Sequence, residues 1–488
     1  MSIMDRIQKS AAAALALLLC AGLAACSAQP QAVPVQSAQE AASGDGVIQF
    51  TDDTGREITL NGPCSRIISL YSAHTENLYE IGAGEKLIGV YTGTVYPPEA
   101  AQLPSYDYKG DPEQVIAAQP DLVLIRPVIA RKAPDYVAQI ESAGIPVVSL
   151  YPDSYEKFAD YIARLAQLTG TEAAAQRRLA DFYAAIDTVK SVTARVTEKK
   201  TVFMEATESE MRTVTPDSMP GRAIVFAGGI NIAVDAQPVE QGSGIAAYGI
   251  EKLLENANRI DVYVTQLGPM NADANPASIG ARAGFDTIKA IKEDRVYFIT
   301  DKLINSPTFR FQKGVAEIAR FLYPDLMDRL SDYENSKTAT RLDLAQIIVK
   351  VRHLPVYVPS SSKYYETGQK GHIFGLFEDV RWHDAGFDAA ETAVFGGYVD
   401  WEKSADGREY FHPQQPVTRE ALAKAAFLIG GFTPTADTAI ADINLCQAPE
   451  AVQTLVDQGL FVLEDGRFNP GRTVTNKDIL AVLKAVAG

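Results

Sequence analysis

The chain has 488 residues, of which 47% are hydrophobic and 22% are charged, a composition typical of folded globular proteins and long enough for more than one domain. Its formal net charge is -16, from 61 acidic and 45 basic residues, which argues against non-specific binding of nucleic acid because that binding requires a basic surface. The net charge does not restrict the class of small-molecule ligand, since a local cleft can carry the opposite sign.

The first 26 residues have the order of features found in a bacterial lipoprotein signal. Arg6 and Lys9 precede an apolar stretch, residues 11–19, which is too short to span a bilayer as a helix. Small residues then lead to Cys26. This segment resembles the lipobox, which implies a signal peptide over residues 1–25 and a lipid anchor on Cys26. The alternative is an ordinary secretory signal in which Cys26 is incidental.

A short tether is predicted between this signal and the folded part. Residues 26–46 are rich in Ala, Gln, Ser and Pro and lack apolar periodicity. From residue 47 onward, short apolar runs alternate with helical patterns, which predicts a parallel sheet covered on both faces. The first α/β lobe is therefore expected over residues 47–152. Its predicted strands are residues 67–70, 87–90, 122–125 and 146–150, and two of its helices are residues 75–81 and 112–118.

A helical stretch separates this lobe from a second one. Residues 153–198 carry apolar side chains at helical spacing and are predicted to form a bridging helix. Strand-like runs return at residues 202–204, 262–264 and 296–299, which predicts a second α/β lobe over residues 199–328. The fold class is therefore α/β, with two Rossmann-like lobes joined by a long rigid helix. Because that helix has no Gly-rich hinge, we expect the lobes to close only slightly.

Residues 338–488 have a different pattern, with few strands and three similar helix starts. Thr340, Thr418 and Thr475 each stand where an N-cap is expected, with an acidic residue two or three positions further on. Units repeated at this spacing indicate an array whose neighbours share a core. We therefore expect a mainly α-helical C-terminal repeat domain.

The order and spacing of several motifs in residues 50–325 resemble one class of bacterial periplasmic binding proteins, class III, which serves ferric-siderophore, haem and cobalamin importers. The resemblance implies two lobes with the ligand in the cleft between them and delivery to an ABC permease dimer. The motifs that carry it are residues 51–59, 65–70, 75–84, 87–90, 119–123 and 144–148.

Two acidic residues match positions that this class uses for docking. Glu113 and Glu251 each open a short helix that leads through an Asp into an apolar strand. The simple explanation is the helix macrodipole, which favours a carboxylate in the first turn. The resemblance implies a further role, in which this pair contacts arginines of the permease dimer.

The C-terminal units resemble S-layer homology repeats. The Thr418-Arg419-Glu420 sequence fits that family's key motif best, whereas the first unit has Thr-Arg-Leu-Asp and the third has Thr-Asn-Lys-Asp. Residues 354–372 look like an insertion in the first unit. The resemblance implies binding of a secondary cell-wall polymer. The departures in two units leave a purely structural helical appendage as the alternative.

Ligand-binding residues are predicted from the position of the strands, because ligands of open parallel sheets bind beyond the carboxyl ends. Aromatic and guanidinium groups there suit a flat or bulky anionic chelate. His74 is a possible metal ligand, or it caps a helix or bonds a backbone carbonyl. For Arg131 the alternative is a plain surface charge. The predicted set is Tyr71, His74, Tyr91, Arg126, Arg131, Arg212 and Arg310.

The sequence contains no Gly-x-Ser-x-Gly elbow, P-loop or His-Glu-x-x-His motif, so no enzyme, resident metal or cofactor is predicted. We expect an extracytoplasmic, lipid-anchored solute-binding component of an ABC importer. Its expected cargo is a ferric siderophore or related metal chelate, with haem or a corrinoid as alternatives. Its expected partners are the permease, the membrane and a wall polymer, but no nucleic acid. The rival hypothesis is a structural protein of the cell envelope whose repeats bind wall polymer.

Overall fold

The computed structural model describes residues 46–240, 243–268, 270–271, 274–354, 375–382 and 384–487. The predicted signal peptide, Cys26, the tether up to residue 45 and nearly all of the predicted insertion lie outside these residues. Residues 46–488 form one compact unit. Within the described ranges, none of the helices combines the length and apolar character that crossing a membrane requires.

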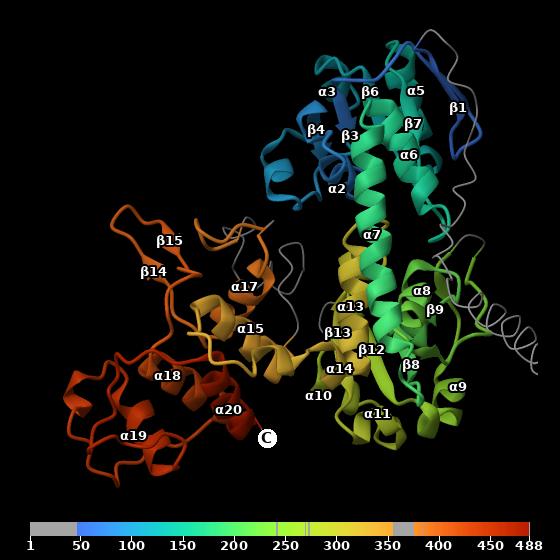
Figure 1. The fold of residues 1–488 in the computed structure, drawn as a ribbon. Helices are drawn as coiled ribbons and strands as arrows, with labels where there is room; N and C mark the ends of the chain where they lie inside the picture. The colour runs from blue at the N-terminus through green and yellow to red at the C-terminus, as the bar shows by residue number, and fades with distance from the viewer. Residues whose placement is uncertain are drawn as a thin grey trace, which may run out of the picture. The chain divides into compact units, whose positions relative to one another are not determined.

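The first lobe is built on a five-stranded parallel sheet with the strand order β5-β4-β3-β6-β7 (Figure 1). Successive residues of its strands point into two separate apolar cores, as Leu122 and Val123 of β6 do, because side chains alternate along a strand. Both cores consist of buried hydrophobic side chains, which explains why the strands are apolar without interruption. The strands are β3 (Ile67–Ser69), β4 (Leu87–Tyr91), β5 (Ser105–Tyr106), β6 (Leu122–Ile125) and β7 (Val147–Ser149).

Four helices cover this sheet, and a small antiparallel hairpin precedes it. The predicted strands are confirmed, whereas β5 and the hairpin were not predicted. The helices are α2 (Ser72–Glu80), α3 (Glu113–Ala117), α4 (Pro127–Lys132) and α5 (Pro134–Ser142), and the hairpin strands are β1 (Ile48–Thr51) and β2 (Glu57–Leu60).

The second lobe has a four-stranded parallel sheet with the order β10-β8-β12-β13. The same alternation sends Val202 and Phe203 of β8 into different cores. The sheet strands are β8 (Thr201–Glu205), β10 (Ile230–Asn231), β12 (Val262–Leu267) and β13 (Val296–Thr300), and a small antiparallel pair is β9 (Thr213–Val214) with β11 (Ile245–Ala246). The helices are α8 (Met219–Phe226), α9 (Ile250–Glu255), α10 (Pro276–Gly280), α11 (Lys289–Lys292), α12 (Asp301–Ile304), α13 (Phe311–Leu322) and α14 (Pro324–Met327).

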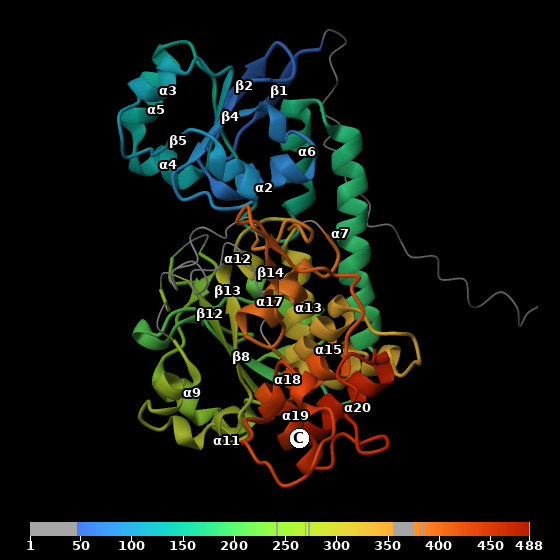
Figure 2. The same ribbon diagram turned by 90° about the vertical axis from the view of Figure 1, so that its left-hand side faces the viewer.

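The connection between the lobes consists of two helices, rather than the single bridging helix expected over residues 153–198. Helix α6 (Phe158–Thr169) ends at Gly170, which has a φ of 65°, because glycine enters the left-handed region at no steric cost. Helix α7 (Glu172–Thr193) then runs between the lobes (Figures 1 and 2). Its 22 residues give a rod about 33 Å long.

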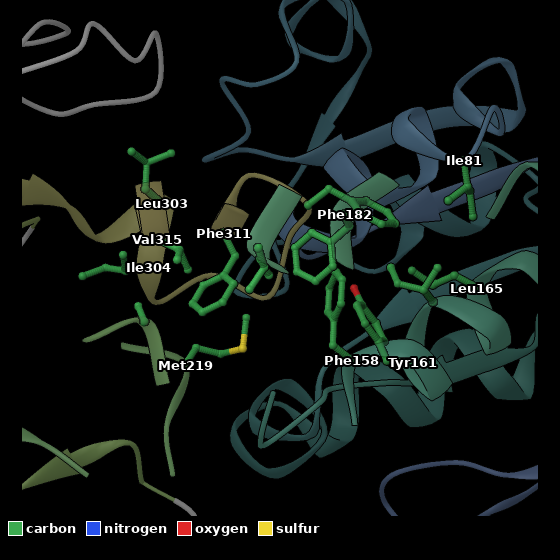
Figure 3. Packing of buried hydrophobic residues seen from close by; sticks show 14 of the residues in the cluster. Ile81, Phe158, Tyr161, Leu165, Phe182, Met219, Leu303, Ile304, Phe311 and Val315 are labelled. Atoms are coloured by element: carbon green, nitrogen blue, oxygen red, sulfur yellow. The ribbon is translucent and has the colours of Figure 1, made fainter. Parts of the chain in front are cut away.

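One apolar core joins both lobes to these two helices. Phe158 of α6 lies 5.0 Å from Phe182 of α7, measured between ring centroids, and Phe182 lies 6.3 Å from Phe311 of α13. Figure 3 shows these rings together with Met219 of α8 and Leu303 of α12. Relative motion of the lobes would expose part of this core to water, which supports the expectation of limited closure.

Residues 338–487 contain a further apolar core packed from helices. All three predicted helix starts are confirmed, because Thr340 and Thr418 are N-caps and Thr475 precedes the third helix and bonds Asp478. We call this part the C-terminal helical region. Its elements are α15 (Arg341–Val351), α17 (Phe387–Phe395), α18 (Arg419–Gly430), α19 (Pro449–Asp457), α20 (Asn476–Ala487) and a hairpin of β14 (Glu402–Lys403) and β15 (Glu409–Tyr410).

Candidate ligand-binding edge and docking surfaces

Aromatic or guanidinium side chains stand at the carboxyl ends of the strands in the first lobe. Tyr91 is the last residue of β4, and Tyr71 and Arg126 are the N-caps of the helices that follow β3 and β6. Tyr151 comes two residues after the end of β7. Because the strands are parallel, these side chains share one edge of the sheet. We call this edge the aromatic edge.

The side chains of the aromatic edge contact one another. The Arg126 guanidinium carbon lies 4.6 Å from the centroid of the Tyr71 ring, and the Tyr71 and Tyr151 rings are 6.2 Å apart. Tyr91 stacks on Tyr108 at 6.2 Å. No acidic side chain among the described residues forms an ion pair with Arg126. Burial raises the pKa of Tyr71 and of Tyr151, so both hydroxyls remain hydrogen-bond donors at neutral pH.

His74 is placed beneath this edge rather than on it. Its side chain is buried, Nε2 donates to the Ile125 carbonyl at 3.0 Å, and Nδ1 lies 2.7 Å from the Tyr161 hydroxyl. Burial lowers the pKa of His74 to about 4, so the ring is neutral at pH 7 and Nδ1 accepts from Tyr161. Both ring nitrogens are occupied. The geometry therefore matches the alternative of a backbone hydrogen bond and corrects the expectation of a ligand contact.

The Arg310 side chain also interacts with other residues of the protein rather than standing at the aromatic edge. Its guanidinium pairs with the Glu76 carboxylate at 2.5 and 2.9 Å, and both side chains are about 5% exposed or less. The guanidinium carbon also lies 4.1 Å from the centroid of the Tyr96 ring. Because Glu76 belongs to α2 and Arg310 precedes α13, this buried pair ties the two lobes together. A buried guanidinium needs a buried counter-ion, which is why Arg310 does not face a ligand.

The other two predicted arginines lie outside the aromatic edge. Arg131 is exposed in the last turn of α4, in agreement with the surface-charge alternative. Arg212 of the second lobe pairs with Glu210. Its charge is therefore already balanced by a neighbour in the chain.

At the corresponding edge of the second lobe, the polar side chains form hydrogen bonds with other groups of the protein. Glu205 at the end of β8 is fully buried and accepts hydrogen bonds from Tyr263 and Arg282. Asn271 bonds the backbone of Ala206, Glu208 and Gln266 through both of its polar atoms. Burial raises the pKa of Tyr263. These polar groups hold loops in place and leave little for a ligand.

Two residues of the aromatic edge were not predicted. Tyr151 directly follows the strand predicted over residues 146–150, so the rule that selected Arg126 would also have selected it. Tyr108 depends on β5, which has only two residues and gives no periodic signal in the sequence.

A cavity of about 410 Å³ lies between the segment that follows β7 and the loops of the second lobe. Its two carboxylates are already paired, Asp153 with Lys157 and Asp217 with Arg222, so it offers mainly hydroxyl and backbone groups. Its lining residues are Asp153, Ser154, Thr215, Pro216, Asp217, Ser218, Val234, Ala236, Gln237, Pro238, Ser243 and Gly244. No cluster of His, Cys, Asp and Glu suited to a metal ion occurs within the described part of the chain.

Glu113 and Glu251 occupy equivalent positions in the two lobes. Each is exposed in the first turn of a short helix, α3 or α9. These helices lead into the amino ends of β6 and β12, which are the edges opposite the carboxyl ends. A surface that used both residues would therefore leave the aromatic edge free.

Residues 67–303 match the family model described as "Periplasmic binding protein". An uncharacterised ABC transporter substrate-binding lipoprotein of Bacillus subtilis, YvrC, is 26% identical over 57% of this chain and 86% of its own length. The vitamin B12-binding protein of Vibrio campbellii is 29% identical over 53% of this chain and 89% of its own length. A solved possible iron-binding periplasmic protein from Staphylococcus epidermidis aligns with a TM-score of 0.48 at 24% identity, covering 53% of this chain and 98% of that one.

The C-terminal helical region, which lies outside the residues matched by the family model, contains two arginines with equivalent contacts. Arg419 donates to the Val462 carbonyl and lies 4.8 Å from the Phe468 ring centroid, and Arg341 donates to the Asp400 carbonyl and lies 5.3 Å from the Phe411 ring centroid. The first unit, which departs from the motif in sequence, thus keeps its arginine in the same role.

The other two predicted wall-binding residues hold the same region together. Thr418 caps α18 by accepting from the Ala421 amide, and Glu420 accepts from the Ala448 amide at 2.7 Å. Isolated bridges join Thr340 to Pro416, Thr418 to Thr473 and Thr475 back to Thr338, so the three helix starts form a closed ring.

Proposed function

We propose that this protein is the extracytoplasmic solute-binding component of an ABC importer, and that it carries a metal chelate such as a ferric siderophore, with haem or a corrinoid as alternatives. The observation that carries the proposal is Arg126, which lies over the Tyr71 ring at the aromatic edge and has no carboxylate partner among the described residues. Two vitamin B12-binding relatives each match 53% of this chain and 89% of their own length.

The chemistry of this edge selects for an anionic ligand with a large flat or bulky surface. A guanidinium fork binds carboxylate, catecholate or phosphate oxygens with two parallel hydrogen bonds. Neutral tyrosine hydroxyls add donors, and their rings add apolar area. An overall negative chain would repel such a ligand at long range, so the local positive group decides where it binds.

The test is a titration of the purified full chain with a ferric catecholate siderophore, haemin and cyanocobalamin, followed by ligand absorbance and tyrosine fluorescence. We expect one of the three to bind with a saturable signal and Arg126→Ala to weaken it. Arg131→Ala is the matched control, because Arg131 lies on the same helix but is exposed. Absence of binding to the whole panel would reject the proposal, and equal losses in both variants would reject the role of Arg126.

We propose that Glu113 and Glu251 dock the loaded protein onto the permease. The support is their equivalent exposed positions on the edges opposite the carboxyl ends. In vesicles carrying the permease, Glu113→Ala with Glu251→Ala should reduce stimulation of ATP hydrolysis, whereas Glu172→Ala, in the first turn of α7, should not. Ligand binding should be unchanged in every variant.

We propose that Cys26 carries a lipid anchor. The support is the sequence order of the signal segment together with the lipoprotein name of one relative. Expression of the full chain should give a membrane-bound protein whose released N-terminal peptide carries acyl chains in mass spectrometry. Cys26→Ser should be unmodified and recovered from the soluble extracytoplasmic fraction.

A second candidate function concerns the C-terminal helical region, which we propose binds a secondary cell-wall polymer. The support is the closed ring of three helix starts and the matched environments of Arg341 and Arg419. The full chain should sediment with purified cell walls of its host, and less so after chemical removal of the polymer. Equal sedimentation with stripped walls would instead leave this region a structural appendage.

A further inference from the structure

Trp382 of the C-terminal helical region contacts the first lobe. Its indole Nε1 donates to the Glu99 carboxylate at 2.8 Å, and its ring meets the Tyr96 ring edge-on at a centroid distance of 5.3 Å. Tyr96 is buried, and Glu99 lies in the short 3-10 helix Pro98–Gln102 between β4 and β5. An indole bonded to a carboxylate and packed against an aromatic ring is a specific contact rather than chance proximity.

The same short segment also contacts the second lobe. Asp388, in the first turn of α17, accepts from Lys313 of α13 at 3.1 Å. Trp382 and Asp388 are only six positions apart, yet they touch different lobes. The C-terminal helical region is therefore attached to both lobes at once, in addition to its covalent connection after α14.

The contact on the first lobe continues into the pair that joins the lobes. The Tyr96 ring that meets Trp382 also lies under the Arg310 guanidinium, which pairs with Glu76. Tyr96, Arg310 and Trp382 all line one cavity of about 840 Å³. A change in the separation of the lobes would therefore shift Tyr96 or Lys313 and disturb the contacts of Trp382 and Asp388.

We propose that the C-terminal helical region braces the two lobes through Trp382 and Asp388 and so restricts their relative motion. This inference goes beyond the proposed function, since it concerns the chain without ligand. It makes the helical region a mechanical part of the binding unit, whichever polymer or surface it contacts elsewhere.

The first test uses fluorescence, because the chain has only two tryptophans. Trp401→Phe in the full chain leaves Trp382 as the only indole. We expect its emission to shift to the red and its quenching by acrylamide to increase when Glu99→Ala or Tyr96→Ala is added. Glu85→Ala, an exposed acidic residue of the same lobe, is the matched control. If the Glu99 and Tyr96 variants behave like the control, the brace does not exist.

The second test measures the separation of the lobes directly. Spin labels on Lys132→Cys and Lys292→Cys, both exposed positions, report a distance between the lobes in the full chain with Cys446→Ser. Trp382→Ala should broaden this distance distribution, whereas Trp401→Ala should not.

A charge exchange tests the contact on the second lobe. Lys313→Asp alone should broaden the distribution, and Lys313→Asp with Asp388→Lys should narrow it again. A distribution that Trp382→Ala and Lys313→Asp both leave unchanged would overturn the proposal even if the fluorescence of Trp382 responds.

Discussion

The two lobes repeat one architecture but use the carboxyl edges of their sheets differently. In the first lobe, Arg126 and Tyr71 contact each other and Arg126 has no acidic partner among the described residues. In the second lobe, Arg282 is paired with the buried Glu205 and with Glu208. Arginines at the matching edges of the two sheets thus differ, because one has no acidic partner among the described residues and the other holds the fold through two carboxylates.

The difference shows that position at a strand end does not by itself make a residue a ligand contact. A guanidinium forms an ion pair with a buried carboxylate nearby, because an unpaired charge in the interior destabilises the fold far more than a paired one. Where no such carboxylate exists, the guanidinium stays available. Under the proposed function, we therefore expect recognition of the ligand to depend more on the first lobe than on the second.

The largest expected effect is on stability and separates the two arginines. Arg282→Met leaves Glu205 as an unpaired buried charge and should lower the free energy of unfolding by about 3–5 kcal/mol. Arg126→Met removes no buried partner and should change it by about 0.5 kcal/mol or less. Urea unfolding followed by circular dichroism measures both. Similar losses in the two variants would erase the distinction between the lobes.

The next largest effect is on ligand affinity, and here the arginine of the first lobe should matter more than that of the second. Arg126→Met should weaken binding of whichever chelate the wild-type chain takes up by about 10- to 100-fold, because it loses charge-assisted hydrogen bonds of about 1.5–3 kcal/mol. Arg212→Met, in the second lobe, should change affinity by about twofold or less, since its charge is already paired. Absorbance titration of the full chain measures both dissociation constants. A larger loss for Arg212→Met would reverse the assignment of the lobes.

The pH dependence of the unfolding free energy tests the burial of His74 beneath the aromatic edge. His74 has a pKa of about 4 in the folded chain, against 6.5 as its ordinary value. The unfolded chain therefore binds more protons between these values, and stability falls as the pH is lowered through this window. At pH 5 the cost should be about 2 kcal/mol relative to pH 7.

The control for this prediction is His74→Gln, because glutamine does not titrate. Unfolding free energies of both proteins at pH 7 and pH 5 isolate the contribution of His74, since all other groups are shared. An identical pH dependence in the two proteins would mean that His74 is accessible to solvent, contrary to its burial.

The smallest expected effect tests whether the equivalent acidic residues of the two lobes matter for folding. Glu113→Ala and Glu251→Ala should each cost about 0.3–1 kcal/mol, because each removes only a favourable interaction with a helix dipole. Thermal unfolding at low salt measures this difference. A cost of several kcal/mol in only one variant would show that the two positions are not equivalent.

The sequence predicted the parts of the fold that depend on local pattern. Uninterrupted apolar runs such as residues 122–125 predicted buried parallel strands, because only a sheet covered on both faces tolerates them. The threonine and acidic residue of each C-terminal unit predicted the helix starts. The position of Arg126 at a strand end was also available from the sequence, and the same rule would have found Tyr151.

Tertiary structure alone decided which side chains remain free. Arg310 and Arg126 both follow predicted strands. Only Arg310 forms an ion pair with Glu76, which is 234 positions away from it in the sequence. Both ring nitrogens of His74 are hydrogen-bonded, to Ile125 and Tyr161, and Trp382 bonds Glu99 of the first lobe, which lies 283 positions earlier in the sequence. Local sequence sets the backbone through short-range preferences, whereas the partner of a charge depends on which distant segments the fold brings within a few ångströms of it.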